Sequence, residues 1–73
     1  MGGKGKRILS IYQRVLDGKA VNKSEEAFRF GVNERTIQRD LDDIRKYLGL
    51  EIRKKRQLIY DRDKKGYLLV EAE

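Results

Sequence analysis

The chain contains no cysteine and no histidine among its 73 residues. Without cysteine there is no disulfide framework and no thiolate metal site, which fits a reducing compartment. The absence of both residue types also removes the usual nucleophile–base pairs of enzymes and almost every zinc or iron site. Carboxylates, lysines and tyrosines alone would have to carry any catalysis, so we expect no enzyme activity, no metal and no cofactor.

Long apolar runs are also missing. No stretch of 18 apolar residues occurs, so the sequence predicts no membrane-spanning helix. The basic start, M-G-G-K-G-K-R, is not followed by the apolar run of a signal peptide. Since 41% of the residues are charged and 38% hydrophobic, we expect one small, very polar globular domain in the cytoplasm, with a modest core.

Positive charge is in excess and unevenly distributed. Eighteen lysines and arginines face twelve acids, a net charge of +6. Residues 51–66 hold seven basic and three acidic residues, and residues 1–7 add three basic ones. Residues 33–48 are neutral, with four of each sign. Such an excess favours a polyanionic partner, and phosphate is the natural one.

The most regular pattern lies in residues 33–48. Ile37, Leu41, Ile44 and Leu48 follow one another at steps of four, three and four, which places them on one stripe of a helix. Asn33 stands just before this run and can cap the first turn with its side-chain oxygen. The segment therefore predicts an amphipathic helix that begins at a well-capped end.

The outward face of the first two turns carries side chains that read base edges and phosphates, namely Arg35, Thr36, Gln38 and Arg39. Glu34 and Asp40 are expected beside the apolar stripe, so this face shows no carboxylate. The pattern is typical of a recognition helix in a DNA major groove. A merely solvated face would look similar, so the neighbouring segments decide between the two interpretations.

Upstream, the spacing predicts a helix over residues 6–17, with Ile8, Leu9, Tyr12, Val15 and Leu16 on a broad apolar face. Gly18 suits the helix end, and Val21 a single β-bridge. We expect residues 1–5 to be a flexible basic arm or a remnant of cloning.

A second helix is expected over residues 23–30. Asn22 caps it, and Glu25 completes a capping-box pattern. Gly31 ends it with a positive φ, and Val32 is expected to be buried in the turn before Asn33. A short helix, a glycine-containing turn and a second capped helix make the helix-turn-helix plan. An ordinary αα-hairpin in a small bundle remains the alternative.

Two β-prone runs follow, at residues 57–61 and 66–70, and predict an antiparallel hairpin. Placed after a recognition helix, a basic hairpin is the wing of a winged helix, whereas the basic run alone would indicate only a solvated loop. We therefore predict an α+β winged helix-turn-helix domain over residues 6–71. Its cations would lie on phosphate or in the minor groove: Lys54, Lys55, Arg56, Arg62, Lys64 and Lys65.

The core of this domain is expected to surround the 33–48 helix. Helices, turn and wing would each contribute apolar side chains, and together they would hold the first two turns of that helix in place. Arg35 or Arg39 is then the candidate for a bidentate contact to guanine and Gln38 for one to adenine. The expected core residues are Ile8, Tyr12, Leu16, Phe28, Ile37, Leu41, Ile44 and Leu68.

Three sequence words resemble a known family. They are I-L-S-I-Y-Q, F-G-V-N-E-R-T-I-Q-R-D-L-D-D-I-R and I-Y-D-R-D-K-K-G-Y-L-L. From Arg7 to Val70 the chain resembles the N-terminal winged helix-turn-helix domain of bacterial regulators of the DeoR-like and WYL-domain type. The resemblance implies a transcriptional regulator that binds specific double-stranded DNA, usually as a homodimer on a pseudo-palindromic operator, in the cytoplasm with the nucleoid. The same four helix residues would read bases.

The resemblance also carries a difference. Members of the family continue into an effector-sensing or WYL domain, whereas this sequence stops at Glu73. We therefore expect either an excised or a free-standing DNA-binding domain, with no effector site in these residues. Two other partners remain open, RNA and an acidic protein. The Arg-Thr-Gln-Arg face favours DNA over RNA, because A-form RNA closes its major groove to side chains.

Overall fold

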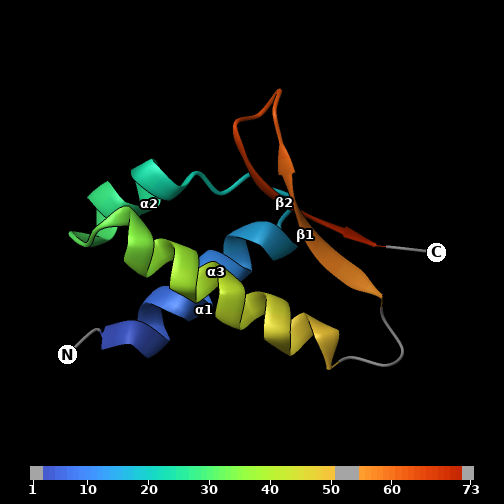
Figure 1. Ribbon diagram of the computed structural model, residues 1–73, viewed down its shortest axis with the longest axis horizontal. Helices are drawn as coiled ribbons and strands as arrows, with labels where there is room; N and C mark the ends of the chain where they lie inside the picture. The colour runs from blue at the N-terminus through green and yellow to red at the C-terminus, as the bar shows by residue number, and fades with distance from the viewer. Residues whose placement is uncertain (1–2, 51–54, 72–73) are drawn as a thin grey trace.

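The computed structural model describes residues 3–50 and 55–71 of the chain. Within these residues three helices precede a two-stranded antiparallel hairpin, so the predicted α+β winged helix-turn-helix fold is confirmed. In Figure 1, α3 crosses the molecule beside α1, with α2 at one end and the hairpin at the other. The elements are α1 (Gly3–Leu16), α2 (Lys23–Phe30), α3 (Glu34–Gly49), β1 (Arg56–Asp61) and β2 (Gly66–Glu71).

The first helix begins earlier than predicted. Residues 3–5 belong to α1 instead of forming an arm, and the helix ends at Leu16, before Gly18 with its φ of 81°. Two ion pairs fasten its first turns to α3. Lys4 Nζ lies 3.4 Å from Asp43 Oδ2, and Arg7 pairs with Asp40. The glycines at the start of α1 disfavour a helix there. Ion pairs to residues at least 33 positions away in the sequence stabilise these first turns instead.

The hairpin is anchored to the helical part through Val21. Both strands are one residue longer than predicted, and Leu58 of β1 turns into the core. On the other edge of β2, Val21 N donates to Tyr67 O at 2.9 Å and Tyr67 N donates to Val21 O at 2.7 Å. The predicted β-bridge at Val21 is therefore confirmed, and it fixes the wing beside the start of α2.

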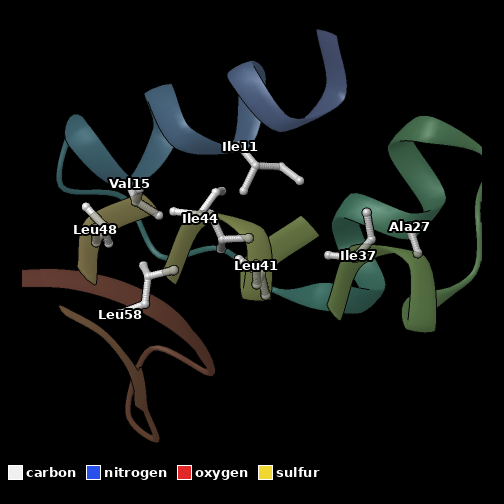
Figure 2. Close-up of a cluster of buried hydrophobic side chains, with 9 residues drawn as sticks. Ile11, Val15, Ala27, Ile37, Leu41, Ile44, Leu48 and Leu58 are labelled. Atoms are coloured by element: carbon white, nitrogen blue, oxygen red, sulfur yellow. The ribbon is translucent and has the colours of Figure 1, made fainter. Parts of the chain in front are cut away.

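The core lies where α1, α2, Val21 and the hairpin pack against α3 (Figure 2). Of the predicted core residues, Ile37, Leu41 and Ile44 are buried, whereas Ile8 and Tyr12 are half-buried against the core. The buried apolar residues are Ile11, Val15, Val21, Ala27, Ile37, Leu41, Ile44, Leu48 and Leu58.

On α1 the buried stripe differs from the predicted one. Leu16 is 42% exposed and Leu9 68% exposed, whereas Ile11 is fully buried. The stripe that meets α3 runs at steps of three and four, from Ile8 through Ile11 to Val15. Leu9 and Leu16 lie on the neighbouring side of the helix, so the prediction that Leu16 is in the core is wrong.

In α2 the prediction that Phe28 is in the core is wrong. Phe28 is 91% exposed, whereas Glu26 and Ala27 are buried and Phe30 is half-buried against the core. Ala27 allows the close approach of α3, and the buried Glu26 carboxylate lies 3.7 Å from Arg14 Nε and 3.8 Å from Arg29 Nε. Phe28 follows about 100° further round the helix, which turns it to solvent.

Leu68 is also not a core residue. It is only half-buried, because successive side chains of a strand point to opposite faces. Its neighbours in β2, Tyr67 and Leu69, pack against the core instead. The hairpin therefore meets the helices with the face that carries Leu58 and Leu69, which are register partners.

Candidate nucleic-acid interface

The turn between α2 and α3 has the geometry that the sequence predicts. Asn22 Oδ1 accepts from Glu25 N at 3.0 Å, and Asn33 Oδ1 accepts from Thr36 N at 2.9 Å, so both predicted caps are confirmed. Gly31 adopts a φ of 67°, as expected for the left-handed end of α2. Val32 is half-buried against the core. The two helices are thereby held as a helix-turn-helix.

Arg35 and Arg39 project from the outer face of α3 in its first two turns. Both are exposed, and among residues 3–50 and 55–71 neither has an ion-pair partner. The two guanidinium groups therefore keep their donors available. Thr36 is more restrained, since its hydroxyl donates to Asn33 Oδ1 at 3.0 Å and so supports the cap. Its hydroxyl oxygen can still accept a hydrogen bond.

Gln38 is held by a residue that sequence reasoning missed. Lys23 Nζ, from the first turn of α2, donates to Gln38 Oε1 at 3.0 Å. On the other side, Gln38 Nε2 donates to Asp42 Oδ1 at 3.1 Å. The position of Lys23 could have suggested this contact. It directly follows the Asn22 cap, and the start of α2 lies against α3 in a helix-turn-helix.

The wing tip, residues 62–65, is fixed by hydrogen bonds on both of its sides. Asp61 Oδ1 accepts from the backbone N–H groups of residues 63 and 64, at 2.8 and 3.0 Å. Asn22 Nδ2 donates to Lys65 O at 2.8 Å, so one amide caps α2 and holds the wing. Arg62, Lys64 and Lys65 are all exposed on this tip. Three of the predicted backbone cations therefore share one ordered loop.

The remaining predicted wing cations lie elsewhere. Arg56 is half-buried at the base of β1, where its Nη2 donates to Tyr12 OH of α1 at 3.1 Å. Lys55 is exposed just before that strand, at the end of the hairpin remote from the tip. Lys54 lies outside the described residues. The structure thus divides the predicted set into a tip cluster and a base group.

A ring of contacts joins α2, α3 and the wing. Asp42 Oδ1 lies 3.6 Å from Arg45 Nη1, and Arg45 Cζ lies 5.4 Å from the centre of the Tyr67 ring. Tyr67 in turn packs edge-on against Tyr60, with 5.3 Å between ring centres, and its backbone pairs with Val21. From Val21 the chain returns through residue 22 to Lys23. The outer face of α3 and the wing tip are therefore placed relative to each other by direct contacts.

A buried ion pair sets the position of α3 beneath this face. Asp40 is fully buried, and both of its oxygens accept from Arg7, whose Nε donates to Oδ2 and whose Nη2 donates to Oδ1 at 3.1 Å. The hydrogen bond to Asp40 is the main cause that raises the pKa of Arg7 above its ordinary value, and the carboxylate charge adds to it. The sequence placed Asp40 beside the apolar stripe but indicated neither its burial nor its partner.

The described part of the chain contains no grouping of carboxylates suited to a metal ion. Its helices are all too short or too polar to cross a membrane. Comparisons of the chain with family models, with curated proteins and with solved structures find no match.

Proposed function

We propose that the chain is the DNA-reading domain of a bacterial transcriptional regulator. The first two turns of α3 would enter the major groove of a specific duplex, and the wing tip would lie on the backbone or in the adjacent minor groove. The observation that carries the proposal is the pair of exposed arginines, Arg35 and Arg39, which have no ion-pair partner among the described residues. A guanidinium group binds guanine through O6 and N7, a contact worth about 1–3 kcal/mol of discrimination.

The wing tip supports this proposal by its charge and its attachment. Its cations, Arg62, Lys64 and Lys65, are exposed, and the bond from Asn22 to the Lys65 carbonyl ties them to the start of α2. Lysine and arginine contacts to phosphate hold a protein in register on the duplex without reading its sequence. We assign affinity mainly to the wing tip and specificity mainly to α3.

The family resemblance completes the proposal. Regulators of the DeoR-like and WYL-domain type bind pseudo-palindromic operators as dimers. By that resemblance two copies would occupy two half-sites about one helical turn apart, on DNA in the cytoplasm. No cofactor, metal or membrane enters this proposal, and the first assay of it requires only the chain and a DNA duplex.

Replacing Arg39 by alanine separates base reading from general attraction. We expect the variant to bind a duplex enriched from a random pool about fivefold to 150-fold more weakly, because it loses a contact of about 1–3 kcal/mol. Binding to an unrelated duplex of equal length should weaken less than about threefold. Fluorescence anisotropy with both duplexes at one fixed salt concentration measures the two effects.

Two controls accompany this variant. Lys46→Ala removes the same charge from α3 two turns further on, so it should weaken binding to both duplexes equally. Replacing Lys64 and Lys65 together by glutamine should also affect both equally, and should flatten the salt dependence of binding by about one to two units. An equal loss on both duplexes for Arg39→Ala would instead make Arg39 a phosphate contact. Tighter binding to RNA than to any duplex would overturn the proposal.

A further inference from the structure

The side-chain amide of Gln38 has its orientation imposed from both ends. The Lys23 ammonium group can only donate hydrogen bonds, so the atom that faces it at 3.0 Å is the amide oxygen. An ionised carboxylate can only accept, so the atom that faces Asp42 at 3.1 Å is the amide nitrogen. Reversing the amide would break both bonds and oppose donor to donor and acceptor to acceptor.

The amide keeps one acceptor and one donor for a ligand. Its oxygen has a second lone pair, and its nitrogen a second hydrogen. In the major groove adenine offers the matching pair, an N6 donor and the N7 acceptor, whereas guanine offers two acceptors, O6 and N7. A freely rotating glutamine can turn its amide to suit several partners. The amide of Gln38 is fixed, so in front of guanine its oxygen would face the O6 acceptor and the two oxygens would repel each other.

We propose that Gln38 reads adenine and that Lys23 and Asp42 are the positioning residues that exclude guanine at the same base pair. The inference rests on the proposed function, because it names the base preference of that same surface. Asp42 is itself braced, since its Oδ1 lies 3.6 Å from Arg45 Nη1 and Arg45 lies over the Tyr67 ring of β2. The selectivity of one α3 side chain is thus set by residues from α2, α3 and the wing.

Two substitutions made together remove the constraint while leaving Gln38 in place, because either partner alone would still orient the amide. Asp42→Asn keeps the shape of the side chain but offers both a donor and an acceptor, so either end of the Gln38 amide can face it. Lys23→Met keeps most of the length of the side chain and removes its donor. Lys64→Met is the matched control, since it removes one positive charge from the wing tip, where the side chain has no partner among the described residues.

The test starts from a 20-base-pair duplex enriched by the wild-type chain from a random pool. Gln38→Ala first identifies the base pair that Gln38 reads, as the position whose preference the variant loses. Duplexes with A·T or G·C at that position then give a ratio of dissociation constants. We expect about tenfold preference for adenine in the wild type and in Lys64→Met, and about twofold or less in the double variant that combines Lys23→Met with Asp42→Asn. Circular dichroism and urea unfolding confirm that each variant is folded.

Each other result has a defined meaning. If Gln38→Ala removes the preference but the double variant of Lys23→Met and Asp42→Asn retains the full ratio, the positioning role is overturned and DNA reading by α3 stands. If Gln38→Ala changes the preference at no base pair, or the preferred base is guanine, the assignment of Gln38 to adenine is overturned. If the wild-type chain binds no duplex at low salt, the proposed function itself fails.

Discussion

Replacing Asp40 by alanine is expected to lower the free energy of unfolding by about 3–5 kcal/mol. The carboxylate is fully buried and accepts from two nitrogens of Arg7, whose side chain is 13% exposed. Removing it leaves the partly buried guanidinium group without its partner. A domain of this size has only about 4–11 kcal/mol of stability in total. Urea unfolding followed by circular dichroism should therefore show a greatly lowered midpoint.

Two companion variants show whether the unpaired charge is the cause. Asp43→Ala removes another carboxylate of α3 that pairs with a cation of α1, but that pair is exposed, so the loss should stay below about 1 kcal/mol. Replacing Arg7 by methionine together with Asp40→Leu should restore most of the stability, because apolar residues often substitute well for a buried ion pair. If Asp40→Ala costs no more than Asp43→Ala, the pair does not fasten α1 to α3.

Replacing Gly66 by alanine is expected to cost about 3 kcal/mol. A Cβ atom at this position would lie 2.9 Å from Val21 O, 3.0 Å from Val21 C and 3.1 Å from Ala20 Cβ. Val21 cannot retreat without loss, since it makes both backbone hydrogen bonds to Tyr67. Forcing an extra carbon into packed structure typically costs about 1–3 kcal/mol, and the upper end applies where the neighbour is backbone. Urea unfolding measures the loss.

Gly49→Ala is the control for this substitution. Nothing lies within 4 Å of a Cβ built on Gly49, the last residue of α3. Alanine there should leave stability unchanged or raise it by up to about 1 kcal/mol, through its better helix propensity. A loss below about 0.5 kcal/mol for Gly66→Ala would mean that the hairpin is not held against Val21 in solution.

The features that sequence reasoning predicted are those set by neighbours along the chain. Asn22 and Asn33 cap the helices that follow them, Gly31 ends α2, and the apolar period of residues 33–48 places Ile37 and Leu41 in the core. Each depends on a few adjacent residues and on helix geometry. The order of helices and hairpin follows from these local elements.

The features that it missed depend on which surfaces meet. Burial of Asp40 requires Arg7 to arrive from 33 residues away, and the constraint on Gln38 requires Lys23 from 15 residues away. The apolar character of Phe28 predicts a core position, yet at the close crossing of α2 and α3 the buried residue is Ala27. Apolar periodicity predicts which face of a helix is buried, but it does not predict which residues of other elements contact that face.

The central claim, that α3 reads the sequence of a DNA duplex, is tested most directly by selection. The chain is incubated with a random-sequence duplex pool at moderate salt, and the bound fraction is sequenced over several rounds. We expect an enriched motif that contains guanine contacted by Arg35 or Arg39 and that disappears when both arginines are replaced by alanine. Binding without any enriched motif would contradict base reading by α3, and absence of binding even at low salt would contradict DNA binding altogether.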